Sequence, residues 1–155
     1  MIQTTSRRLA ALLVFFLLVA ITAAIGAQFE PGAWYEQLNK PAWNPPNWIF
    51  PPVWTILYAG IPVPGWLVWR SSASTGPALT LWLSQLVANG LWSWLFFGLH
   101  RPGVALLDIV LLLGLIASFI VAARRHSIVA SWLFVPYALW VAFAASLIAA
   151  TWRAN

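Results

Sequence analysis

The chain has 155 residues, of which 62% are hydrophobic and only 7% are charged, and its formal net charge is +5. A soluble domain carries about 25% charged residues, so this chain cannot cover a water-facing surface and needs lipid as its main solvent. In lipid the backbone must satisfy its own hydrogen bonds, which leaves helices or a closed barrel. The apolar runs are continuous over about 20 residues instead of alternating, which favours helices. We therefore predict an all-α, multi-pass integral membrane protein with one domain spanning residues 1–155.

Composition also excludes several classes of function. The eight Lys and Arg residues stand singly or in pairs between apolar runs, which is typical of loop anchors and topology signals and not of nucleic-acid binding. The chain has no cysteine, which excludes disulfides, thiolate catalysis and cysteine metal ligands. His100 and His126 fall on opposite sides of the membrane in the predicted topology. We therefore expect no metal site, no cofactor and no acid–base catalytic residues.

The apolar segments and their interruptions predict the membrane topology. We predict five transmembrane helices, at about residues 9–27, 52–69, 78–97, 104–123 and 128–151. Arg7 and Arg8 precede the first segment, so a secretory signal peptide is an alternative, but the apolar run exceeds the roughly 7–15 residues of such a signal. Pro62 and Pro64 predict a kink or a broken turn in the second helix, and Pro136 predicts an interruption in the fifth.

The predicted first loop is the longest and is rich in aromatic residues and proline. It contains Trp34, Trp43 and Trp48. Its Asn44-Pro45-Pro46-Asn47 run cannot form continuous helix, because proline lacks the amide donor and restricts the residue before it. Residues 34–39 could form one helical turn. Tryptophan suits the membrane–water boundary, so an aromatic belt is one interpretation, and a rigid lid over a pocket is the other.

The distribution of basic residues predicts the orientation. Five spans place the two ends of the chain on opposite sides of the membrane. The N-terminal side then holds five basic residues and the other side three; the five are Arg7, Arg8, Arg70, Arg124 and Arg125. The positive-inside rule predicts a cytoplasmic N-terminus and an external first loop. We expect a bacterial cell membrane as the location.

Among the polar residues inside the predicted spans, three are candidates for function. Asp108 is the only acid within a span, which is a functional hypothesis by default, and its alternative is a near-surface acid that reaches the boundary. Gln85 and Asn89 are four residues apart, so they share one helix face. Such residues can hydrogen-bond between helices or line a cavity. The first role is favoured for Gln85, and the second for Asn89, which lies nearer the middle of its span.

Aromatic and proline residues also recur in an order that extends over nearly the whole chain. The motifs are Trp34-Tyr35, Lys40-Pro41, Trp43, Pro45-Pro46, Phe50, Pro52-Val53-Trp54, Leu57-Tyr58, Gln85-Leu86, Asn89, Trp92, Phe96-Phe97-Gly98, Asp108, Pro136-Tyr137, Trp140 and Phe143-Ala144. In order and spacing they resemble the signature of the tryptophan-rich sensory protein family, TspO/MBR, which includes the mitochondrial translocator protein.

The resemblance implies a bundle of five transmembrane helices, often dimeric, in which the long first loop caps a pocket. The implied function is that of a receptor or regulatory protein for porphyrins, other haem-pathway tetrapyrroles and benzodiazepine-type compounds. Light- and oxygen-dependent porphyrin degradation, with Trp34 and Trp140 taking part, is one alternative, and tetrapyrrole or sterol transport is another. By motif match, the ligand-binding residues are Trp34, Pro46, Trp54, Tyr58, Asn89, Trp92, Asp108, Trp140 and Ala144.

The chain departs from the family pattern at several positions. Ile148 follows Leu147, where members commonly carry Asn, so one polar pocket contact is expected to be lost. Ala149 stands where the proposed cholesterol motif has its tyrosine, which argues against cholesterol as a ligand. Pro51, Pro62 and Pro64 replace residues that are usually glycine or small, so the second helix is expected to bend differently.

Overall fold

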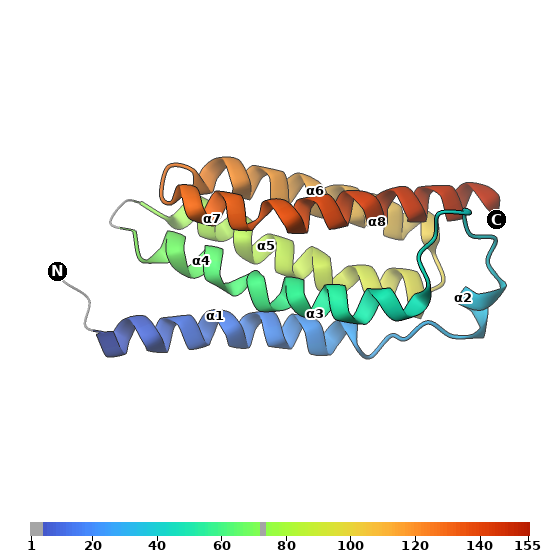
Figure 1. Ribbon diagram of the computed structural model, residues 1–155, viewed down its shortest axis with the longest axis horizontal. Helices are drawn as coiled ribbons and strands as arrows, with labels where there is room; N and C mark the ends of the chain where they lie inside the picture. The colour runs from blue at the N-terminus through green and yellow to red at the C-terminus, as the bar shows by residue number, and fades with distance from the viewer. Residues whose placement is uncertain (1–4, 72–73) are drawn as a thin grey trace.

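The computed structural model describes residues 5–71 and 74–155, and all regular secondary structure within these ranges is helical. Residues 1–4 and 72–73 of the predicted single domain lie outside the described residues. The long helices run side by side along one axis (Figure 1), with α1 (Thr5–Gly26) on one face and α6 (Pro102–Ala123) and α8 (Val135–Ala154) on the opposite face. The helix α1 begins at one end of the bundle and α8 ends at the other.

Within the described residues, three stretches of helix are long and apolar enough to cross a membrane. They are Thr5–Gly26, Pro102–Ala123 and Ile128–Ala154, the last being made of α7 (Ile128–Leu133) and α8. Their outward side chains are apolar, since Leu13, Leu107 and Leu139 are 70%, 73% and 67% exposed. An apolar surface of this kind matches the hydrocarbon of a bilayer.

Prolines divide two of the helical segments. The segment predicted at 52–69 forms α3 (Phe50–Gly60) and α4 (Pro62–Trp69), with the single residue Ile61 between them. The break predicted from Pro62 is therefore confirmed, because a proline starts a helix readily but cannot donate within one. Likewise Phe134 separates α7 from α8, and a proline lies in the first turn of α8.

The segment predicted at 78–97 changes its helical type. It forms α5 (Gly76–Ser93), which continues directly into η2 (Trp94–Gly98), a π-helix. A π-helix has a wider turn than an α-helix and often occurs at functional sites. Here the wider turn carries Phe96 and Phe97, both of which line the cavity described below.

The first loop, residues 27–49, contains two short helices, α2 (Ala33–Gln37) and η1 (Asn47–Ile49). It lies at the end of the bundle where α8 ends (Figure 1). The Asn39 backbone N–H donates to Asn155 Oδ1 at 3.0 Å, and Asn155 Nδ2 donates to the Asn39 carbonyl oxygen at 3.1 Å. This pair of hydrogen bonds fastens the loop to the end of α8.

The opposite end of the bundle is filled by side chains. Trp82 is fully buried there, and its Nε1 donates to the Ile61 carbonyl oxygen at 3.0 Å. The indole approaches α4 closely because Gly65 has no side chain, and a Cβ added to Gly65 would lie 2.6 Å from Trp82 Cε2. Phe15 of α1 packs against the same indole, edge to face, at 4.8 Å.

Candidate functional site

A cavity of about 420 Å³ lies at the loop end of the bundle. Its lining comes from the end of α1, the first loop, α3, the end of α5 with η2, α6 and the second half of α8. Pockets for small molecules commonly measure about 300–1,000 Å³ and are mostly apolar, with a few polar groups. This cavity has that size and that character.

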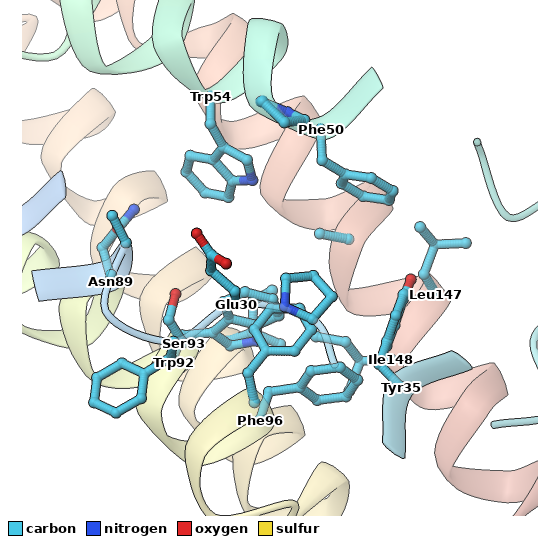
Figure 2. Close-up of a pocket in the computed structure, with 18 of the residues that line it drawn as sticks. Glu30, Tyr35, Phe50, Trp54, Asn89, Trp92, Ser93, Phe96, Leu147 and Ile148 are labelled. Atoms are coloured by element: carbon cyan, nitrogen blue, oxygen red, sulfur yellow. The ribbon is translucent and has the colours of Figure 1, made fainter. Parts of the chain in front are cut away.

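Two aromatic walls face each other across the cavity. Figure 2 shows Phe50 and Trp54 on one side and Trp92 and Phe96 on the other. Trp54 stands next to Tyr58, with ring centroids 5.3 Å apart, and Trp92 stacks on Phe96 at 5.5 Å with an interplanar angle of 9°. Flat π-faces on opposite walls suit a planar, conjugated ligand.

A chain of hydrogen bonds runs from the cavity wall into the bundle. The Tyr58 hydroxyl donates to Asn89 Oδ1 at 2.6 Å, and Asn89 Nδ2 donates to the Tyr137 hydroxyl at 2.6 Å. The Tyr137 hydroxyl in turn donates to Gln85 Oε1 at 2.9 Å. Three helices, α3, α5 and α8, are thereby joined. Because Tyr58 and Asn89 line the cavity while Tyr137 and Gln85 are fully buried behind it, the chain holds this wall in place.

The side chains of Gln85 and Asn89 therefore have the roles favoured from the sequence, a hydrogen bond between helices for Gln85 and a place in the cavity lining for Asn89. Gln85 forms a hydrogen bond between helices, and Asn89 both lines the cavity and bonds to two other helices. A buried amide with bonded partners costs far less than an unpaired one. The Gln85 amide nitrogen is the exception, since it is buried without a hydrogen-bond partner among the described residues.

Loop residues supply most of the remaining polar groups. Glu30, Tyr35, Asn44 and Asn47 line the cavity from the loop, and Ser93 does so from α5. Burial raises the pKa of the Tyr35 hydroxyl above its usual value, and a hydrogen bond with the Asn44 side chain opposes part of that shift. The phenol of Tyr35 is therefore neutral at physiological pH. Among the described residues that line the cavity, Glu30 is the only acidic or basic one.

A comparison with protein families identifies the chain. A family model described as the TspO/MBR family matches residues 10–153. The chain belongs to the TspO/MBR family. It is 39% identical over 147 residues to protein CrtK of Rhodobacter capsulatus, which covers 92% of this chain and 91% of that protein.

Two further TspO/MBR relatives show how widely the similarity extends. The chain is 37% identical over 135 residues to the tryptophan-rich sensory protein of Cereibacter sphaeroides, which covers 87% of this chain and 85% of that protein. It is 35% identical over 148 residues to the human translocator protein, which covers 91% of this chain and 88% of that protein. Similarity over nearly full length, together with the apolar helices, makes this chain a TspO/MBR membrane protein.

The structure brings five of the residues predicted from the TspO/MBR motifs to the lining of the cavity. They come from three different helices, and they are Trp54, Tyr58, Asn89, Trp92 and Ala144. The motifs mark residues far apart in sequence, and the bundle gathers these five around one space.

The two tryptophans predicted to act in porphyrin degradation lie one contact behind the lining. Trp34 stacks on His100, with ring centroids 4.4 Å apart, and meets the lining residue Phe96 edge to face at 5.5 Å. Trp140 meets the lining residue Phe50 edge to face at 5.9 Å, and its Nε1 is buried without a hydrogen-bond partner in the described part of the chain. Both indoles therefore support the aromatic walls from behind.

The other two predicted residues also lie outside the lining. Pro46 is exposed and precedes Asn47, which does line the cavity. Asp108 is half-buried on α6 beside the lining residue Ile109, and one of its carboxyl oxygens is buried without a hydrogen-bond partner among the residues described.

Several lining residues were not predicted as site residues. Phe50 and Phe96 belong to the TspO/MBR motifs, so their aromatic character was a usable signal. Glu30 and Ser93 have no such signal, because a loop acid and a helix serine usually face solvent or their own backbone. Ile148 lines the cavity where TspO/MBR members commonly carry Asn, so this part of the wall is apolar.

Proposed function

We propose that this TspO/MBR protein is a membrane receptor or regulatory protein that binds a porphyrin or a related haem-pathway tetrapyrrole in the cavity at the loop end. The observation that carries the proposal is the pair of facing aromatic walls, Phe50 and Trp54 opposite Trp92 and Phe96, around a mostly apolar space of about 420 Å³. A planar macrocycle has two large π-faces, which such walls can stack against. The same geometry suits benzodiazepine-type aromatic compounds.

The proposal includes five membrane spans and a capping role for the first loop. In addition to the three long apolar helices, α3 with α4 and α5 with η2 would each cross the bilayer, since they run beside the others along the same axis (Figure 1). Loop residues Tyr35, Asn44 and Asn47 line the cavity, which supports a lid. The N-terminus would face the cytoplasm.

The orientation can be tested with single cysteines, because the chain has none of its own. A cysteine at Gly32 in the first loop should react with a membrane-impermeant maleimide applied to intact cells, and a cysteine at Ser71 should react only after lysis. The reverse pattern would contradict a cytoplasmic N-terminus. The proposal also includes a homodimer, which the family resemblance implies. It is tested separately, by measuring the protein mass of the purified detergent complex with light scattering.

The binding proposal is tested by titrating purified protein with protoporphyrin IX and following tryptophan fluorescence. We expect saturable quenching. Trp54→Ala should weaken binding by about tenfold, since one aromatic stacking contact and its buried area are lost. Trp43→Ala is the matched control, because Trp43 is 60% exposed and does not line the cavity. Quenching that does not saturate, or equal affinities in the two variants, would contradict the proposal.

A further inference from the structure

We propose that Glu30 sets the charge preference of the cavity, so that a ligand binds with a positively charged or N–H-donating group toward this carboxylate. The proposal rests on the proposed function, since it requires a ligand in the cavity. It makes Glu30 a specificity-determining residue of the site, and it predicts which side of a ligand faces which wall.

The first observation is that no other acidic or basic residue lies among the described residues that line the cavity. The other polar side chains of the lining are neutral hydroxyl and amide groups, on Tyr35, Asn44, Asn47, Tyr58, Asn89, Ser93 and Thr151. Within the ranges that the structure describes, no Lys, Arg or His nitrogen lies within 4.0 Å of the Glu30 carboxylate. The negative charge of Glu30 is therefore available to a ligand.

The basic residue of the loop, Lys40, makes its contacts with groups other than Glu30. The Lys40 ammonium lies over the Tyr35 ring, 4.5 Å from its centroid. It also donates to the carbonyl oxygens of Glu36 and Leu38, each at 3.4 Å. These contacts occupy the ammonium, and Lys40 forms no ion pair with Glu30.

The second observation is where the Glu30 carboxylate points. Figure 2 shows it between the two aromatic walls, directed toward Trp54. The face of an indole ring carries negative potential, and it attracts cations and N–H groups as a carboxylate does. Aromatic rings combined with an unpaired carboxylate form an environment that favours positive charge.

A ligand carboxylate at the same place would meet two sources of repulsion. Two like charges a few ångströms apart repel each other, weakly in bulk water and more strongly near a protein surface. Glu30 is an exposed residue, so water screens part of this repulsion. The acidic side chains of a tetrapyrrole would therefore lie away from Glu30, and its nitrogen-bearing or cationic part would lie toward it.

The test uses three porphyrins that share one ring and differ at two side chains, which are negative, neutral or positive. They are protoporphyrin IX, its neutral dimethyl ester, and the analogue with protonated aminopropyl groups in place of the propionates. Each is titrated against the wild type, Glu30→Gln and Glu36→Gln, with tryptophan quenching as the readout. Glu36 is a suitable control because it is an exposed acid of the same loop that does not line the cavity.

We expect the wild type to bind the aminopropyl analogue about tenfold more tightly than protoporphyrin IX, as one partly screened charge interaction allows. Glu30→Gln should reduce this ratio to within about twofold, because the amide keeps the shape of the carboxylate but not its charge. Glu36→Gln should keep the wild-type ratio.

Each contrary result has a distinct meaning. If the wild type bound the two charged porphyrins equally, or if Glu30→Gln kept the wild-type ratio of their affinities, the role of Glu30 would be overturned but the proposed function would not. No saturable binding of the neutral ester to the wild type would overturn the proposed function, and this proposal with it. Thermal unfolding of Glu30→Gln checks that the variant is folded.

Discussion

The two ends of the bundle differ in how tightly they are packed, although α3 and α4, which follow each other in one helical segment, contribute to both. No residue of α3 is buried, whereas α4, which follows after one residue, buries Pro62, Pro64, Gly65 and Val68. The helix α3 forms a wall of the cavity, and α4 fills the core. A membrane bundle can therefore be solid at one end and hollow at the other without any change in its helical architecture.

The difference comes from side-chain size and hydrogen bonding. At the α4 end a glycine lets a tryptophan approach the helix, and an indole fills the remaining space. At the loop end the large rings of Trp54 and Trp92 stand on opposite walls. The hydrogen bonds from Tyr58 through Asn89 to Tyr137 join these helices and fix their positions, because a shift would leave buried polar groups unpaired.

The largest expected effect is overpacking at the solid end. In Gly65→Ala the new Cβ would lie 2.6 Å from Trp82 Cε2 and 2.9 Å from Phe15 Cδ1. Both rings are held by neighbours, so we expect a loss of about 1–3 kcal/mol of stability. Thermal unfolding in detergent measures this loss.

Gly60→Ala provides the matched control. Gly60 ends α3 and has nothing within 4 Å of an added Cβ. We expect the stability of this variant to be unchanged or slightly raised, since alanine is more favourable in a helix than glycine by about 1 kcal/mol. Equal destabilisation by the two substitutions would show that the tight packing around Gly65 is not what stabilises this end.

The next effect concerns the hydrogen bonds that join α3, α5 and α8 beside the cavity. Tyr137→Phe keeps the ring but leaves Asn89 Nδ2 and Gln85 Oε1 without their shared partner. We expect a loss of about 1–2 kcal/mol of stability and weaker porphyrin binding, since the wall loses its link to α8. Thermal unfolding and fluorescence titration measure the two quantities.

Ser118→Ala serves as the comparison for Tyr137→Phe. The Ser118 hydroxyl is exposed and donates to the Gly114 carbonyl oxygen of its own helix at 2.8 Å. Its removal should change neither stability nor affinity measurably. If Tyr137→Phe bound porphyrin as tightly as Ser118→Ala, the hydrogen-bond chain would have no part in shaping the cavity.

The smallest expected effect is on the hydrogen bonds that attach the first loop to the end of α8. Asn155→Ala removes both hydrogen bonds to the Asn39 backbone. These bonds are exposed, so the unfolding free energy should fall by no more than about 1 kcal/mol. The loop should nevertheless open more often, which increases the rate at which a glutamate-specific protease cleaves after Glu36.

Ser146→Ala, an exposed change on the same helix, should leave that cleavage rate as it is in the wild type. An unchanged rate in Asn155→Ala would mean that other contacts, such as the stacking of Trp34 on His100, hold the loop by themselves.

Part of the site was predictable because some of its residues differ clearly from their neighbours in the sequence. Asn89 stands out as an amide within an apolar span, and Trp54 and Trp92 stand out within proline-rich or polar surroundings. Tyr137, Asn89 and Gln85 were all recognised as motif residues, but the hydrogen bonds that join them were not predicted. A hydrogen bond between helices depends on their rotation and axial position, which a single sequence does not reveal.

The sequence by itself determined that this protein is helical and belongs in a membrane, because few charges and long apolar runs leave the backbone no other way to satisfy its hydrogen bonds. It also determined where the helices break, since proline lacks the donor that a continuous helix requires. Only the tertiary structure decided which tryptophans line the cavity and which support it from behind. It alone brought Glu30 to the cavity wall, because long-range packing sets the distance between a loop and a helix that are remote in sequence.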